Sequence, residues 1–250
     1  MLAMGTLLIL QIGSQETIVD RAGKAAELFW QQFTAVRSLE HVTQEKLKDD
    51  GAVVAKRSAD FDYLALLATK GGSVAVEESR VPRTRVADKP EEFLKTSGFP
   101  ALLLMFHPDY RDRFQFEESP GSDVPTGLIR VAFRSRPNLH ALSAVKLNGR
   151  LFPILWRGFA WIERNTGAIT RMESTLDVPM EDIGVTELQA SVEYEPVALS
   201  KIGQTYRLPV RVSVIVRSQK QQWRDTHEFT GYQLFTVTTQ TRGETQGSQP

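Results

Sequence analysis

The sequence predicts a mainly β fold with two helices. We expect one large, curved antiparallel sheet of about ten or eleven strands, a half-barrel, with an N-terminal helix and an apolar helix in the concave face. Three observations lead to this prediction. Residues 151–179 have the pattern of a long hairpin, much of the remaining chain alternates apolar and polar residues, and only two segments have helical features.

The hairpin is predicted at LFPILWRGFAWIERNTGAITRMESTLDVP, residues 151–179. Asn165 and Gly167 suit a tight turn, because asparagine tolerates turn geometry and glycine adopts a positive φ. The incoming strand, 151–163, is apolar on both faces near its middle, so neither face is expected to be fully wet. On the outgoing strand, strict alternation puts Ile169 on a charged face, opposite Met172. The hairpin should therefore lie mid-sheet with another element across it.

Two segments are expected to be helical. In residues 18–36 apolar side chains recur at steps of three and four, and Thr17 or Ser14 is placed to cap the start. Residues 99–106 follow cap-type residues and carry Pro100 in the first turn. This second segment is apolar around its whole circumference, so it must be covered on nearly every side. The hollow of a curved sheet would cover it.

The remaining strands are predicted from alternation bounded by turn residues. We find no internal repeat and no domain linker in the sequence. The expected strands are residues 39–47, 53–69, 73–85, 113–118, 128–136, 144–147, 184–199, 207–217 and 222–239.

Composition and length indicate a single half-barrel domain, residues 16–240, followed by a polar tail, 241–250, that is expected to be disordered. Apolar residues make up 41% of the chain, which is ample for a core. The 30 basic and 30 acidic residues cancel. We therefore expect no nucleic-acid partner, and membrane contact that is peripheral at most. The absence of cysteine removes disulfides and thiolate chemistry.

Residues 1–15 contain an apolar run that is too short to span a bilayer. Its length and position fit the apolar part of a secretory signal whose basic N-terminal part is missing. We interpret it as a truncated signal segment and expect a periplasmic or secreted bacterial protein. The alternative is a first buried strand or a frayed apolar end.

The sequence predicts no catalytic set, no metal site and no cofactor. The four histidines are scattered, and His107 is expected to make a hydrogen bond at the end of the apolar helix. No serine sits in a nucleophile elbow, and no glycine-rich phosphate loop follows a strand. Neighbouring acidic residues on a strand point to opposite faces, so we interpret them as solvated surface. These pairs are Asp49–Asp50, Glu77–Glu78, Glu117–Glu118 and Glu181–Asp182.

Large aromatic residues are more numerous than one face of a thin sheet would hide. Base stacking would need interleaved basic residues and a net positive charge, which the neutral balance does not supply. The rings either pack a dry core or keep part of the hollow free for an apolar ligand, with residues 99–106 as plug or lid. The candidate lining residues are Phe99, Leu103, Phe106, Trp156, Phe159, Trp161 and Met172.

The segment WIERNTGAITRME, Trp161–Glu173, resembles the W-I-D-x-x-T-G-x-I-x-R hairpin of bacterial periplasmic half-barrel proteins. These include the outer-membrane lipoprotein carrier LolA and the sigma-factor regulator RseB, and in wider pattern the chain also resembles uncharacterised exported bacterial proteins. The resemblance implies a curved sheet of about eleven strands, closed on one side by helices, that holds acyl chains or senses lipoproteins. Glu163 stands where the family has aspartate, and no arginine matches the one that latches the carriers' lid.

Three functions stay open at this point. The first is an exported, non-enzymatic binding protein whose hydrophobic cavity takes an acyl chain, a lipophilic small molecule or an acylated protein. The second is a protein–protein interaction module with a filled core and no small-molecule ligand. The third is a hydrolase with a carboxylate pair assembled across strands. A large charged residue at Leu103 is expected to abolish the ligand or the fold, because a buried unpaired charge costs several kcal/mol.

Overall fold

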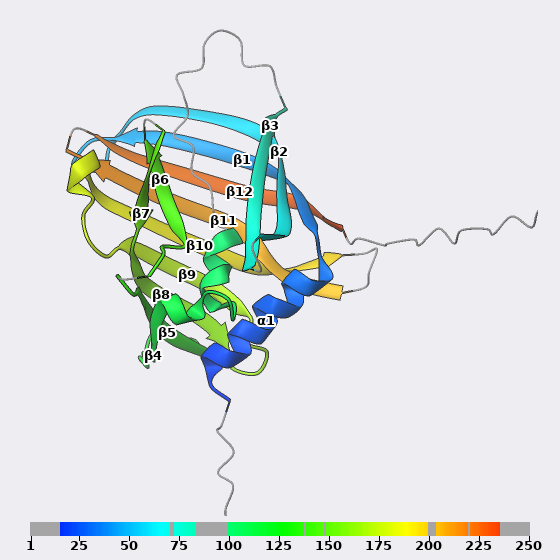
Figure 1. The fold of residues 1–250 in the computed structure, drawn as a ribbon. Helices are drawn as coiled ribbons and strands as arrows, with labels where there is room; N and C mark the ends of the chain where they lie inside the picture. Colours follow the sequence, from blue (N-terminus) through cyan, green and yellow to red (C-terminus); the bar gives the residue numbers. More distant parts are fainter. Residues whose placement is uncertain are drawn as a thin grey trace, which may run out of the picture.

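A computed structural model of the 250-residue chain shows one large, open sheet that curves around its own concave side (Figure 1). The structure describes residues 16–235 except 71–72, 84–99, 138, 148, 200–203 and 220. The predicted signal segment, the predicted tail and Phe99 lie outside the described residues.

Ten antiparallel strands form the main sheet in the order β3-β2-β1-β12-β11-β10-β9-β8-β5-β4, and β6 and β7 form a separate hairpin. This confirms the predicted half-barrel class, because the sheet is curved and its edges, β3 and β4, do not meet. The strands are β1 (Ala35–Leu47), β2 (Val53–Lys70), β3 (Ser73–Pro82), β4 (Phe114–Glu118), β5 (Leu128–Ser135), β6 (Ser143–Leu147), β7 (Arg150–Ile154), β8 (Trp156–Glu163), β9 (Ile169–Leu176), β10 (Val185–Leu199), β11 (Gln204–Ser218) and β12 (Gln222–Phe235).

The predicted N-terminal helix is present but shorter, as α1 (Ile18–Gln32). The Thr17 hydroxyl accepts a hydrogen bond from the backbone N–H of Asp20 at 3.1 Å, and the Asp20 carboxylate accepts one from the N–H of Thr17 at 3.1 Å. This reciprocal capping box begins the helix. Val36 continues the helical spacing in the sequence, but it is an inward residue of β1, so the periodicity extended the prediction too far.

The predicted apolar helix is a 3-10 helix, η1 (Pro100–Phe106), and not an α-helix. This tighter helix usually occurs in runs of about three or four residues, so η1, with seven residues, is a long example. Leu102, Met105 and Phe106 are buried, as the apolar circumference predicted, and Leu103 is half-buried. Two further 3-10 turns are η2 (Arg111–Arg113) and η3 (Glu181–Ile183).

The predicted hairpin is confirmed at β8 and β9, with Gly167 at φ 73° in the turn. The single incoming strand predicted at 151–163 is wrong, because the chain changes partner at Leu155. Ile154 pairs with Ser143 in the β6–β7 hairpin, whereas Trp156 pairs with β9. Pro153 explains the break, because a residue without an N–H is not suited to a central strand.

A β-bulge corrects the predicted faces of β9. Trp161 pairs with Arg171 but Ile162 pairs with Ile169, so Thr170 is an extra residue on β9. The bulge turns Ile169 to the inner face together with Met172, and both are buried in the core.

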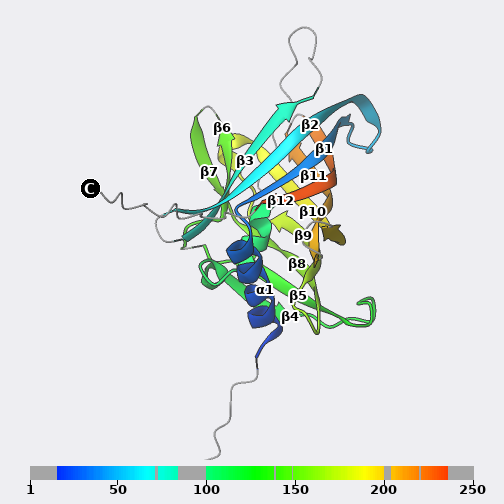
Figure 2. The same ribbon diagram turned by 90° about the vertical axis from the view of Figure 1, so that its right-hand side faces the viewer.

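Helix α1 is seated on the concave side by close backbone contacts (Figure 2). A Cβ at Gly23 would lie 2.8 Å from the carbonyl oxygen of Phe106, so only glycine allows α1 to approach η1 this closely. A Cβ at Gly167 would lie 2.5 Å from the carbonyl carbon of Arg21, so the β8–β9 turn abuts the start of the helix. Arg111 also pairs with Asp20 at 2.7 Å.

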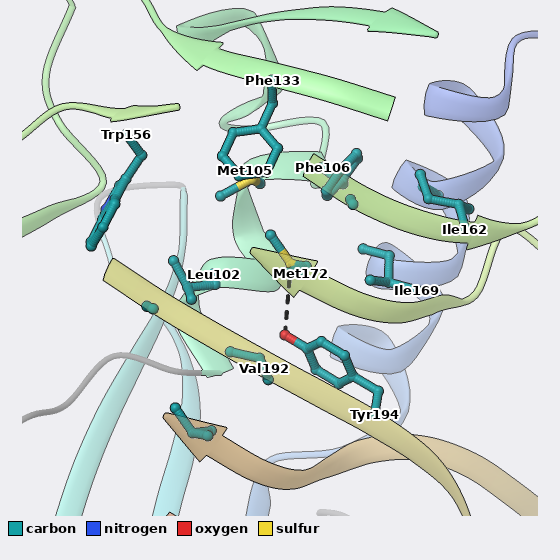
Figure 3. Packing of buried hydrophobic residues seen from close by; sticks show 14 of the residues in the cluster. Leu102, Met105, Phe106, Phe133, Trp156, Ile162, Ile169, Met172, Val192 and Tyr194 are labelled. Atoms are coloured by element: carbon teal, nitrogen blue, oxygen red, sulfur yellow. Dashed lines mark hydrogen bonds between the residues drawn. The ribbon is translucent and has the colours of Figure 1, made fainter. Parts of the chain in front are cut away.

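The core lies between η1 and the inner face of the sheet (Figure 3). Met105 and Phe106 of η1 face Met172 of β9, which pairs with Val192 of β10. The Tyr194 hydroxyl donates to the Met172 sulfur at 3.7 Å. This packing fixes the position of η1, and with it one wall of the groove described next.

Candidate ligand-binding groove

The structure divides the predicted lining residues between the two faces of the sheet. Phe106, Trp156 and Met172 are buried on the inner face. Phe159 and Trp161 alternate with the inward residues of β8 and lie on the outer face, so the expectation that they share the hollow is corrected. On the outer face their rings contact arginine guanidinium groups. Arg130 lies 5.2 Å from the Phe159 ring centroid, and Arg171 lies 5.1 Å from that of Trp161. Leu103 is half-buried at the edge of the core.

The space beside η1 is almost completely filled. A void of about 30 Å³ remains next to Leu103, between the helices and strands β1, β2, β11 and β12. That volume accommodates about one water molecule. The hollow beneath η1 is therefore a packed core and not an open cavity.

A larger groove runs beside α1. It has a volume of about 400 Å³ and lies between the helix, the β8–β9 hairpin and the ends of β10 and β11. Three alanines of α1 line it, and their small side chains leave the space open. The lining residues are Ala22, Ala25, Ala26, Phe29, Trp30, Leu103, Glu163, Thr166, Ala168, Ile169, Tyr194, Pro196, Thr205, Tyr206 and Arg207.

An ion pair lies at the hairpin side of the groove. Arg207 donates through Nε to Glu163 at 3.0 Å and through Nη1 to the Tyr194 carbonyl oxygen at 3.2 Å, and Thr166 donates to the other Glu163 oxygen at 2.5 Å. Burial raises the pKa of Glu163, but the hydrogen bonds from Thr166 and Arg207 outweigh this effect, so its pKa lies below the ordinary value of 4.5. The carboxylate is therefore charged at neutral pH and cancels the charge of Arg207.

Three apolar residues separate the groove from the void. Phe29, Trp30 and Leu103 line both spaces. The Trp30 indole Nε1 is buried and has no hydrogen-bond partner among the described residues. The ring centroids of Phe29 and His107 lie 6.1 and 6.3 Å from that of Trp30.

A buried charged cluster occupies another part of the inner face. The Glu40 side chain, which is wholly buried, accepts from Arg80 Nε at 2.5 Å and from Arg80 Nη2 at 2.9 Å, and it contacts His227 Nδ1 at 2.8 Å. Tyr63 donates to Glu78 at 2.6 Å beside them. Burial raises the pKa of Glu40, but the hydrogen bonds from His227 and Arg80 outweigh it, so the pKa lies below 4.5.

The polar inner face continues along β1. Gln44 donates to Asp225 at 2.8 Å and accepts from Arg57 Nε at 2.9 Å. The sequence signal for this face is the alternation of Ser38, Glu40, Val42 and Gln44, which by itself predicts no role for them. Mutual pairing satisfies Glu40 and Gln44, which fits a structural role for these two residues better than an open site.

The structure gives no metal cluster among the described residues. His107 makes the predicted helix-end bond, accepting from the Asp109 N–H at 3.2 Å. Most of the paired acidic residues are exposed as predicted. Glu78 is the correction, because its side chain is only 10% exposed next to Arg80.

A shallow groove of about 460 Å³ on the outer face holds Asp177 and Glu187. Each of these carboxylates is paired with an arginine, Asp177 with Arg134 at 2.9 Å and Glu187 with Arg217 at 3.4 Å. A hydrolytic pair would need a carboxylate free to act on a substrate.

Fold and groove together define an open half-barrel with an apolar groove beside its N-terminal helix. No family model matches the sequence, and no curated protein is similar to it. Among solved structures, the chain is similar to a DUF1329 family protein from Desulfovibrio piger ATCC 29098, with a TM-score of 0.44 and 9% identity over 87% of this chain and 91% of that chain. In the described part of the chain, no helix is long and apolar enough to cross a membrane.

Proposed function

We propose that the protein is an exported, non-enzymatic binding protein that takes an acyl chain or another lipophilic group, free or attached to a protein, into the groove beside α1. The observation that carries the proposal is the space of about 400 Å³ left by Ala22, Ala25 and Ala26 opposite Ile169 and Tyr194. Small-molecule sites typically measure about 300–1,000 Å³ and have mostly apolar walls with a few polar groups.

The composition of the walls supports a hydrocarbon ligand. Each methylene that leaves water for an apolar wall contributes about 0.8 kcal/mol, so a chain lying along the alanines would bind without any charged contact. The paired Arg207 and Glu163 supply a polar rim at one end. Among the described residues that line the groove, Glu163 is the one carboxylate, and general acid–base hydrolysis by a carboxylate pair would need a second.

A specific observation favours the interaction module as a second candidate. The core beneath η1 is packed, and the void beside it is about 30 Å³. A protein that only presented its edges or loops to a partner would need no more space than this. The two candidates differ in whether the groove beside α1 is occupied.

Native mass spectrometry of protein purified from its own host, followed by titration with a fluorescent fatty-acyl probe, tests the proposal. Ala26→Phe should fill the groove and weaken probe binding at least tenfold. Leu28→Phe is the matched control, because Leu28 is 56% exposed on the same helix. Ligand-free protein that also refuses the probe, or equal binding by both variants, would favour the interaction module. Cell fractionation of the host tests export.

A further inference from the structure

One leucine of η1 lies at the boundary between the groove and the packed core. Leu103 lines both the groove beside α1 and the void of about 30 Å³. Its neighbours Leu102 and Leu104 are 5% and 2% exposed, whereas Leu103 is half-buried. Among the described side chains of η1, Leu103 is the one that lines the groove, so it is the part of η1 that a ligand there would meet.

The void beyond Leu103 has apolar walls from β1, β2, β11 and β12. The hydroxyl groups of its two tyrosines are engaged, because Tyr63 donates to Glu78 at 2.6 Å and Tyr232 donates to the carbonyl oxygen of Pro209. A polar end group that entered this space would lose its hydration, which is costly without new hydrogen bonds. Only the hydrocarbon end of a ligand would gain from reaching it.

The other two residues that line both spaces belong to an aromatic cluster. The ring centroid of Phe29 lies 5.2 Å from that of Phe33 and 6.0 Å from that of Tyr206. The Trp30 ring packs against Phe29 and His107. Shortening either ring would disturb these contacts. Leu103 has an aliphatic side chain, so the boundary can be opened there while the ring contacts stay in place.

We propose that Leu103 determines the length of the hydrocarbon chain that the groove accepts. A chain that lies along the alanines of α1 and reaches Leu103 has only the void of about 30 Å³ beyond it, which is space for about one water molecule. Carbons added past this point therefore stay outside the groove. This inference rests on the proposed function, and it specifies the chain length and the residue that selects it.

The test uses saturated fatty acids from octanoate to hexadecanoate, in single-carbon steps, to displace a fluorescent fatty-acyl probe. With the wild type, affinity should rise about fourfold for each added methylene and then level off. Leu103→Ala should move this limit to chains about two or three carbons longer, because the deleted side chain leaves space that joins the void. Leu28→Ala is the matched control, since Leu28 is 56% exposed on α1, and it should keep the wild-type limit.

Methyl NMR locates the end of the chain. Ala26 lies on the groove side and Ala65 on the void side, where it is 1% exposed. The longest chains should shift the Ala26 methyl resonance in both proteins, but the Ala65 resonance only in Leu103→Ala. If that variant does not fold, Leu103→Val should move the limit by about one carbon.

Two results would overturn the inference while leaving lipophile binding intact. One is a wild-type affinity that keeps rising up to hexadecanoate, and the other is an unchanged limit in the folded Leu103 variant. If no fatty acid displaces the probe from the wild type, the proposed function fails as well.

Discussion

Arg80 makes a bidentate pair with the buried carboxylate of Glu40, with Nε at 2.5 Å from Oε2 and Nη2 at 2.9 Å from Oε1. The Glu40 side chain is wholly buried, and that of Arg80 is 19% exposed. Two ions removed from water are tolerated only when geometry and further hydrogen bonds compensate for lost hydration. His227 supplies the further contact at 2.8 Å. The pair therefore ties β3 to β1 and β12 across the inner face.

Replacing Glu40 by glutamine should destabilise the protein by about 3–5 kcal/mol, because the guanidinium of Arg80 would lose its bidentate partner and keep only the more distant Glu78 carboxylate, at 3.9 Å. Urea unfolding measures the loss. Glu195→Gln, an exposed position on β10, serves as the control and should change stability by about 0.5 kcal/mol or less. Equal stability of the two variants would show that the buried pair contributes little.

The same pair predicts an acid-dependent loss of stability. The pKa of folded Glu40 lies below the ordinary glutamate value of 4.5, so its contribution is fully present above that value and is lost as the pH falls through the folded pKa. The wild-type unfolding free energy should therefore fall more steeply below about pH 5 than that of Glu40→Gln. Urea midpoints measured at several acidic pH values give the difference between the two curves. Parallel curves would contradict this prediction.

The charged cluster could not be predicted from the sequence because its members lie far apart in the chain. Glu40 and His227 are 187 positions apart, and they meet only because β1 pairs with β12. The sequence indicates strands at both places, but no local pattern pairs the first strand of a meander with the last. The same holds for the groove, whose alanines on α1 need the β8–β9 hairpin opposite them to become a wall.

Local chemistry was sufficient where one residue determines the backbone. Of the two predicted caps of α1, Thr17 and Ser14, the structure shows Thr17, and the predicted turn at Gly167 is confirmed. Strict alternation failed where the ladder is irregular, at Leu155 and at Thr170. A bulge reverses the faces on one side of it relative to the other, as at Ile169 before Thr170, and strict alternation cannot predict this.

The two faces of β8 predict opposite responses to truncation. Trp156 is 5% exposed and its indole donates to Ser143 at 2.7 Å, so Trp156→Ala should cost about 3–5 kcal/mol. Phe159 is 38% exposed on the outer face, so Phe159→Ala should cost about 1 kcal/mol or less and leave groove binding unchanged. Denaturant midpoints together with probe titration test both expectations. A large loss at Phe159 would contradict the assignment of faces.

Two substitutions in η1 should separate an effect on folding stability from an effect on binding in the groove. Phe106 is completely buried, so Phe106→Ala should leave a cavity and cost about 3–5 kcal/mol. Leu103 is half-buried at the groove, so Leu103→Ala should cost less and mainly alter probe affinity. Thermal unfolding and probe titration of both variants measure the two effects. If Leu103→Ala were the more destabilising, the packing assigned to η1 would be wrong.

The tightest backbone approach in the hairpin gives the last prediction. A Cβ at Gly158 would lie 1.9 Å from the carbonyl oxygen of Glu173 and 2.9 Å from Cζ of Phe133. The first neighbour is backbone and cannot turn aside, so Gly158→Ala should force β8 away from β9 and cost about 1–3 kcal/mol or more. Gly184→Ala is the control, because Gly184 has a φ of 69° but no atom within 4 Å of an added Cβ. That variant should lose only about 1 kcal/mol of backbone strain. At roughly 2–4 °C per kcal/mol, calorimetry should show a clearly lower melting temperature for Gly158→Ala, and the reverse order would mean that the hairpin is less tightly closed than described.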